Sequence, residues 1–468
     1  MAKVTELKRN EDGIVTVLGV LKQQFGDRFQ TGDAICEQHG HTTTWLKNQS
    51  PDGVVFASSR EEVQSIVDIC ATHKVPVIPY GTGTSLEGHV NAPAGGISVD
   101  VTQMDQILAV HSDDLSCVVQ PGVTREQLNT HLRDQGLFFP IDPGANASLG
   151  GMSATNASGT NAVRYGTMKD NVLAIEAVMA NGEVIRTAQR AKKSSAGYDL
   201  TRLMVGSEGT LGLITEITLK LQGIPEAISS ARCTFPTVDA ACQTVMQVIQ
   251  FGIPVARIEL LDAIQVKACN AYSKLDLPEE PLLLLEFHGS EASVLEQAEM
   301  FGEIAQEHGG GGYTSTTSTE ERNKLWQARH DAYWATLQLR PGAAGISTDV
   351  CVPISRLADC VNAARARLDE EGFVSPIVGH VGDGNFHCLL LIDEQNADEM
   401  ARAGAFVSWL NELAISMDGT CTGEHGIGQG KIPYLAKELG QSTVDVMGAI
   451  KTALDPHGIM NPGKVIAV

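Results

Sequence analysis

Two short motifs in the second half of the chain concentrate residue types that bind metals or move protons. HVGDGNFH contains His380 and His387, and TGEHGIG contains Glu424 and His425. Residues seven apart on a continuous strand face opposite sides, so Gly382–Gly384 must turn the chain if both histidines are to converge. Two imidazoles and a carboxylate suit Zn, Mn or Fe(II), with open positions for substrate oxygens. Histidines satisfied within a core or a hairpin are the alternative.

Three loops rich in small residues form a second group, at residues 79–88, 143–160 and 205–215, each after a predicted strand. From Pro143 to Val163 there is no charged and no aromatic side chain. Backbone this thinly covered can approach a ligand closely, and its N–H groups can form a nest for a pyrophosphate. A flexible linker has similar composition, but the strands that flank this stretch disfavour that interpretation.

The glycine-rich segments of the chain match neither the NAD-binding pattern nor that of a nucleoside triphosphate-binding loop. A Rossmann fingerprint would require glycine where the first loop has Leu86. The tract GEHGIGQGKI has His425 where a phosphate-binding loop needs its first glycine, and Ile432 where it needs serine or threonine. Three loops of one domain could instead wrap one long ligand.

Composition narrows the class of protein. The 468 residues predict two or three domains, and 34 basic against 56 acidic residues give a net charge of −22, which argues against a nucleic-acid partner. The ten cysteines form no C-x-x-C pair, so we expect buried thiols in a reducing compartment. The sequence shows no secretory signal and no apolar run of membrane length, so we expect a cytoplasmic protein.

The hydrophobic pattern predicts an α+β protein in four parts. Residues 1–50 form a helical segment, 51–224 a nucleotide-binding domain, 225–418 a second domain and 419–468 a helical tail. Strand and helix patterns alternate in the second domain, including a helix over Leu357–Glu371, which indicates a split β-α-β sheet.

The three loops, in this order, resemble those of the vanillyl-alcohol-oxidase type of FAD-binding domain. Over its full length the chain resembles the FAD-dependent D-lactate dehydrogenases of the cytochrome type and the wider D-2-hydroxyacid dehydrogenase family. The resemblance implies a two-subdomain FAD-binding domain, and it implies FAD contacts from all three loops and from one residue of the tail. These residues are Pro79, Tyr80, Gly81, Thr82, Gly83, Thr84, Ser85, Pro143, Gly144, Ser148, Gly150, Gly151, Thr155, Asn156, Gly159, Glu208, Gly209, Gly212, Ile214, Thr215 and Asn461.

The same resemblance assigns the chemistry. It implies a divalent metal (Zn, Mn or Fe) on His380, His387 and Glu424, with His425 as general base and hydride transfer to flavin N5. It also places Arg329 on the substrate carboxylate, although a surface helix arginine is an equal alternative on sequence grounds. Relatives with covalently bound flavin have a histidine where this chain has Thr84, so we expect non-covalent FAD.

The expected reaction is oxidation of D-lactate to pyruvate. Ser347 and Thr348 replace a basic residue of relatives that act on 2-hydroxyglutarate, which favours a monocarboxylate, although Arg340 could bind a second carboxylate. The flavin subunit of a glycolate oxidase complex, a D-2-hydroxyglutarate dehydrogenase and a non-catalytic electron-relay flavoprotein are the alternatives. The expected acceptor is a quinone, a cytochrome or an electron-transferring flavoprotein. A homodimer and peripheral contact with the inner membrane are left open.

Overall fold

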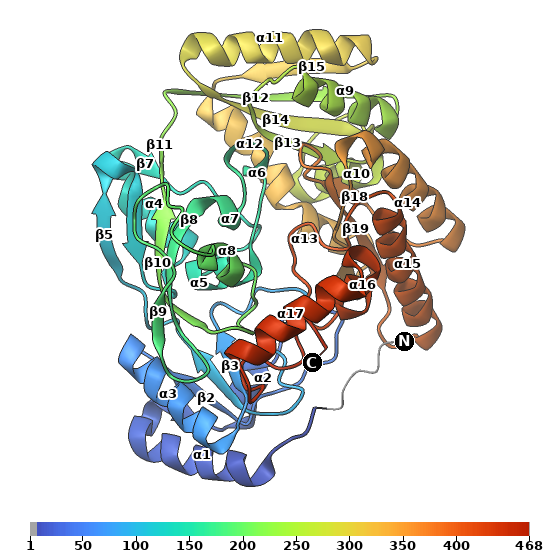
Figure 1. The fold of residues 1–468 in the computed structure, drawn as a ribbon. Coiled ribbons are helices and arrows are strands. Elements are labelled where there is room, and N and C mark those ends of the chain that lie inside the picture. The colour runs from blue at the N-terminus through green and yellow to red at the C-terminus, as the bar shows by residue number, and fades with distance from the viewer. Residues whose placement is uncertain (1–6, 468) are drawn as a thin grey trace. The chain divides into compact units, whose positions relative to one another are not determined.

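The computed structural model describes residues 7–467 and divides into two compact units. Residues 1–6 of the predicted N-terminal segment lie outside the described part of the chain. Unit 1 comprises residues 1–158, 166–224 and 424–468, and unit 2 comprises residues 159–165 and 225–423. Each unit is described separately below, and Figure 1 shows both.

The first half of unit 1 is a small sheet with the strand order β1-β2-β4-β3, in which β2, β4 and β3 are parallel. Its elements are α1 (Glu11–Phe25), β1 (Phe29–Gln30), α2 (Asp33–His39), β2 (Gly53–Phe56), α3 (Arg60–His73), β3 (Val77–Tyr80) and β4 (Ile97–Asp100). One face of α1 is apolar and buried, and Ser59 caps α3 by accepting the N–H of Glu62. Helices α1 and α3 lie side by side against this sheet (Figure 1).

The second half of unit 1 is an antiparallel sheet with the order β5-β6-β10-β8-β9. Strands β7 and β11 form a separate short pair. The elements are β5 (Ile107–His111), β6 (Ser116–Val119), α4 (Arg125–Leu132), β7 (Leu137–Phe138), α5 (Leu149–Thr155), α7 (Met168–Asn171), β8 (Val172–Val178), β9 (Val184–Arg186), α8 (Leu200–Met204), β10 (Leu213–Lys220) and β11 (Gln222–Gly223). Leu149 and Met152 of α5 belong to the same buried core as β6, β8 and β10, so the second predicted flavin loop leads into a helix held by that core.

The tail of the chain belongs to unit 1 and packs on its antiparallel sheet. It contains α16 (Ile432–Leu439) and α17 (Gln441–Leu454), and Ile450 and Leu454 lie against the core of the antiparallel sheet. Buried Lys451 donates to the carbonyl of Thr210 (2.7 Å) and to the carboxylate of Asp455 (2.5 Å). A buried amine needs such partners, and they fix the chain where it returns to β3.

Unit 2 is built on an eight-stranded sheet with the path β15-β12-β14-β13-β18-β19-β16, and β17 also pairs with β19. Its strands are β12 (Ala227–Thr234), β13 (Val255–Leu261), β14 (Leu282–Gly289), β15 (Gly311–Thr316), β16 (Ala344–Ser347), β17 (Val350–Cys351), β18 (Ile377–Gly379) and β19 (Asn385–Ile392). Its helices are α6 (Ala162–Tyr165), α9 (Val238–Gln250), α10 (Ala263–Ser273), α11 (Glu291–Glu307), α12 (Thr319–His330), α13 (Ala332–Leu337), α14 (Leu357–Glu371) and α15 (Ala397–Ser416). Helix α11 lies along the β12–β15 edge of the sheet (Figure 1).

Two features of unit 2 differ from the sequence expectation. Helix α10 was not expected; Asp262, which directly follows β13, caps it by accepting the N–H of Gln265. Residues 159–165 belong to unit 2 because α6 packs on β13, where Arg257 donates to Asn161 (2.8 Å). The predicted flavin residue Gly159 therefore lies outside unit 1.

Nine of the ten cysteines are buried, as the sequence predicts. None of the helices in the described range combines the length and apolar character that a membrane span requires.

Candidate functional site

The three small-residue loops converge in unit 1. The N–H of Ser148, which precedes α5, donates to the hydroxyl of Thr82 in the first loop (3.3 Å). A side chain at Gly81 would overlap Ser148, and one at Gly209 would lie 2.7 Å from the ring of Pro79. The third loop reaches the second through the N–H of Glu208, which donates to the carbonyl of Ala154 (2.8 Å). Small residues therefore allow the backbones of the loops to meet.

The polar groups of these loops fit an FAD site. The hydroxyl oxygens of Ser85 and Ser148 are buried without a hydrogen-bond partner among residues 7–467. In that same part of the chain, the N–H groups of Gly81–Ser85 donate to no backbone carbonyl. Buried hydroxyl groups are rarely left unsatisfied, and a pyrophosphate with its ribose hydroxyls would satisfy them together with the N–H groups of this partly exposed loop.

Asn461 joins the tail to this region. Its side-chain amide donates to the carbonyls of Glu208 (2.7 Å) and His89 (3.1 Å), and its N–H donates to the carbonyl of Val77 (2.8 Å). The structure therefore places Asn461 beside the first and third loops.

The two predicted metal-binding histidines lie together in unit 2. His380 directly follows β18, and His387 on β19 pairs in register with Val378. A turn closes the hairpin, with the N–H of Asp383 donating to the carbonyl of His380 (3.0 Å). The imidazole centroids are 5.5 Å apart and both side chains are buried. The turn that the glycines predicted does bring the histidines together.

Both histidines are held through the same ring nitrogen. Nδ1 of His380 lies 2.7 Å from Oε1 of Glu259, and Nδ1 of His387 lies 2.8 Å from the carbonyl oxygen of Thr348. Metal-binding histidines usually donate one ring N–H to a carboxylate or carbonyl, which fixes the tautomer and orients the other nitrogen. A metal bound here would therefore be bound through Nε2.

Glu259 on β13 links this pair to the predicted substrate-binding arginine. Its fully buried carboxylate accepts a hydrogen bond from Nε of Arg329 (2.7 Å) as well as contacting His380. Burial alone would raise the pKa of Glu259, but the opposite charges and hydrogen bonds of His380 and Arg329 hold it below its ordinary value. Arg329 is thus a half-buried residue of an ion-pair network, not a surface arginine.

Asp349 organises the other side of the histidine pair, and sequence reasoning missed it as it missed Glu259. Its buried carboxylate accepts from the amide of Asn385 (2.9 Å) and the hydroxyl of Thr422 (2.8 Å), and it lies 3.8 Å from Nδ1 of His387. For Glu259 the available signal was an acidic residue between the apolar strand residues Ile258 and Leu260, whereas Asp349 follows two polar residues and carried no such signal.

Glu424 and His425 belong to unit 1 by the division of the chain, whereas Gly423 is the last residue of unit 2. A side chain at Gly423 would overlap the amide of Asn385 and lie 3.1 Å from Asp349. Unit 2 thus fixes the backbone one residue before the predicted ligand Glu424. The assignment of Glu424 and His425 to the metal and to proton transfer stays a proposal.

We expect Gly384→Ala to disrupt the histidine hairpin. Gly384 has φ +81°, and a Cβ there would overlap the carbonyl oxygen of Val352. Strain and overlap together should cost about 2–4 kcal/mol and weaken metal binding, measurable by thermal unfolding and by titration with Zn or Mn. Gly372→Ala is the matched control, because Gly372 has φ +71° but open space at Cβ. Equal behaviour of the two variants would contradict the prediction.

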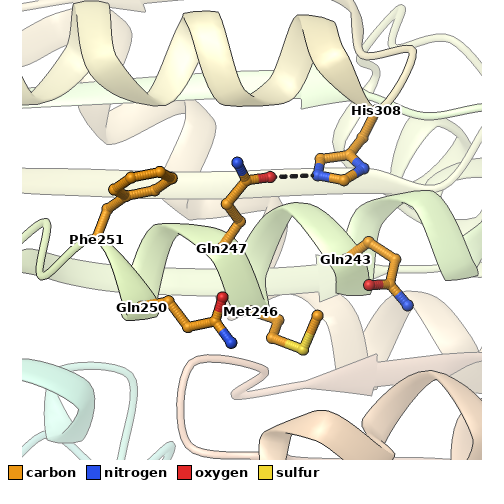
Figure 2. A pocket seen from close by; sticks show the side chains of 6 residues that line it. All are labelled: Gln243, Met246, Gln247, Gln250, Phe251 and His308. Atoms are coloured by element: carbon orange, nitrogen blue, oxygen red, sulfur yellow. Dashed lines mark hydrogen bonds between the residues drawn. The ribbon is translucent and has the colours of Figure 1, made fainter.

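A surface pocket on unit 2 is lined by residues of α9, by Phe251 and by His308, whose Nε2 lies 2.6 Å from Oε1 of Gln247 (Figure 2). None of the predicted site residues lines it.

Comparison with known proteins agrees with this geometry. Residues 51–188 match the family model of the FAD binding domain, and residues 224–465 match that of the FAD linked oxidases, C-terminal domain. The chain is 50% identical over 438 residues to the probable mitochondrial D-lactate dehydrogenase of Danio rerio, covering 93% of this chain and 88% of the relative. It is 47% identical over 416 residues to the mitochondrial D-lactate dehydrogenase (cytochrome) of Arabidopsis thaliana, covering 89% and 73%.

Among solved structures, 4-ethylphenol oxidase from Gulosibacter chungangensis matches with a TM-score of 0.78 at 17% identity, covering 97% of each chain. This likeness confirms the expected α+β fold of vanillyl-alcohol-oxidase type. The family models and the two sequence relatives, which match over nearly the whole length, show that the chain is an FAD-linked oxidoreductase belonging to the family that includes the D-lactate dehydrogenases.

Proposed function

We propose that this protein oxidises D-lactate to pyruvate, with FAD bound by unit 1 and a divalent metal bound by His380, His387 and Glu424. The observation that carries the proposal is the buried histidine pair, in which Glu259 and the carbonyl of Thr348 each hold an Nδ1. That arrangement is typical of metal ligands. The names of the two sequence relatives supply the substrate.

Each group would have a separate task. Bound FAD would supply the acceptor for the two electrons that leave with the α-hydrogen of lactate. A bound metal would supply Lewis acidity that lowers the pKa of the substrate hydroxyl. His425 would take the hydroxyl proton, so that C–O becomes C=O as the α-hydrogen departs. Arg329, oriented by Glu259, would bind the carboxylate.

The surroundings of Arg340 support a monocarboxylate. Its guanidinium forms a two-point ion pair with Glu399, one contact being 3.1 Å, and it also donates to the carbonyl of Leu391 (3.0 Å). An arginine already engaged in this way is poorly placed to bind the second carboxylate of 2-hydroxyglutarate. The proposed acceptor is a cytochrome, a quinone or an electron-transferring flavoprotein.

The test is anaerobic stopped-flow bleaching of the purified flavoprotein with D-lactate, L-lactate, glycolate and 2-hydroxyglutarate. We expect D-lactate to bleach the flavin far faster than the others. Faster bleaching by glycolate or 2-hydroxyglutarate would point to those alternatives, and no bleaching by any substrate would point to an electron relay.

Two further measurements can be made on the same purified flavoprotein. Acid precipitation should release the yellow colour into the supernatant because Thr84 offers no nucleophile to FAD. A redox dye should be reduced during turnover while NAD is not, because the chain lacks a nicotinamide fingerprint. Colour in the washed pellet, or steady NADH formation, would contradict these expectations.

The site of action in the cell is a separate question. The two relatives are named as mitochondrial proteins, and the cytoplasmic location stays a prediction. A homodimer likewise stays a prediction.

A further inference from the structure

Residues Gly426–Lys431 lie within the segment GEHGIGQGKI, which lacks the residue pattern of a nucleoside triphosphate-binding loop. This tract, Gly426–Lys431, has a different role in unit 1. The buried carboxylate of Glu208 accepts the N–H of Ile427 through Oε1 (2.7 Å) and the N–H of Gly428 through Oε2 (2.8 Å). Nε2 of His89 lies 3.2 Å from the same carboxylate. Burial alone would raise the pKa of Glu208, but the imidazole and the two N–H groups hold it below its ordinary value.

The glycines of the tract allow this close approach. Gly426 has φ +85°, and a Cβ there would lie 2.7 Å from Oε1 of Glu208 and 2.8 Å from Nε2 of His89. A Cβ at Gly428 would overlap the carbonyl oxygen of Glu87. The tract therefore presents its backbone, not side chains, to Glu208, and such a glycine-rich backbone has no rigid conformation of its own.

A second set of contacts ties the tract to the residues that follow the first flavin loop. The N–H of Gln429 donates to the carbonyl of Glu87 (2.7 Å), and the side-chain carbonyl of Gln429 accepts from the amide of Asn91 (2.7 Å). Lys431 lies 3.3 Å from the carboxylate of Glu87. The tract is therefore held by Glu208 on one side and by Glu87–Asn91 on the other. We call this set of contacts the socket.

We propose that Glu208 is a positioning residue for His425, which precedes Gly426 directly. This inference rests on the proposed function, in which His425 takes the substrate proton. It also reassigns Glu208, because the resemblance implies a contact with FAD, whereas both oxygens of this carboxylate accept from the backbone of the tract.

The physical reason is the cost of misplacing a base. Charge-assisted hydrogen bonds to two adjacent N–H groups fix a backbone that would otherwise sample many conformations. Proton transfer requires the base within hydrogen-bond reach of the proton. Loss of the socket should therefore slow proton transfer while leaving flavin binding to the three loops.

The test is Glu208→Gln in the full-length flavoprotein. Glutamine keeps the size of the side chain, but its NH₂ group would face one of the two N–H donors. We expect the flavin content of the parent, a fall of about ten- to a hundredfold in turnover with D-lactate and a redox dye, and a small change in KM. The solvent deuterium isotope effect should rise, and amide exchange in a peptide spanning 424–431 should accelerate. Glu208→Asp, which restores the charge, should recover part of the rate.

Glu216→Gln is the matched control, since Glu216 pairs with Arg186 at the surface of the strand that follows Glu208. It should match the parent in all readings. Loss of flavin from Glu208→Gln, or unchanged turnover and exchange, would overturn the proposal. If the parent does not oxidise D-lactate, the proposed function fails, and the flavin content and amide exchange still decide whether Glu208 holds the tract.

If Glu208→Gln does not fold, Gly428→Ala tests the same tract, because the added Cβ would disturb its contact with the backbone of Glu87. The proposal then predicts retained flavin, faster amide exchange over 424–431 and slower turnover, and it fails if turnover and exchange match the parent.

Discussion

Removal of the proposed divalent metal should leave FAD bound and lower the rate with D-lactate at least about a hundredfold. The three flavin loops lie mainly in unit 1, whereas His380 and His387 lie in unit 2, so metal removal should leave the flavin spectrum unchanged. Loss of Lewis-acid assistance should remove several kcal/mol of transition-state stabilisation, at about 1.4 kcal/mol per tenfold. Added Zn or Mn should restore the rate.

Variants separate the predicted roles. His387→Ala and Glu424→Gln should lose the metal and fail to bleach with D-lactate, whereas His425→Ala should keep the metal and lose proton transfer. His308→Gln is a control, because His308 is a histidine of unit 2 outside the site. A chelated protein, metal-free by elemental analysis, that turns over at the original rate would show that the histidines are structural.

Glu259→Gln should weaken both metal binding and the fold of unit 2. The substitution removes the charge that faces Arg329 and His380 inside the unit. Breaking a buried ion pair costs about 3–5 kcal/mol, and loss of the group that orients a metal-binding histidine costs about 10–100-fold in metal affinity. Thermal unfolding and metal titration measure these two effects.

The matched control for Glu259→Gln is Glu399→Gln. Glu399 also pairs with an arginine of unit 2, but that pair is more exposed: the side chains of Arg340 and Glu399 are 38% and 10% exposed, against 16% and 0% for Arg329 and Glu259. The control should lose at most about 1 kcal/mol and keep its metal affinity. Similar losses in the two variants would remove the assignment of Glu259 to the metal site.

Local features could be read from the sequence because their causes are local. The helical start of the chain and the bounds of α14 agree with expectation. Each depends on residues within a few turns of one helix. The glycine turn between His380 and His387 is equally local, since the two histidines are only seven positions apart in sequence. Helix α10 was missed because its sequence, AIQVKACNAYS, has no clear apolar stripe.

The sequence by itself determined the family, the three small-residue loops and the types of the reactive groups, because these depend on residue identity and short spacing. Only the tertiary structure decided what holds those groups. Glu259 contacts Arg329, which is 70 residues away in the sequence, and His380, which is 121 residues away. Glu208 contacts Ile427, which is 219 residues away. No local pattern names such partners: the apolar neighbours of Glu259 indicate burial, but they do not show which distant residue its carboxylate contacts. Packing of the sheet and the tail buries these carboxylates, and burial makes their partners obligatory.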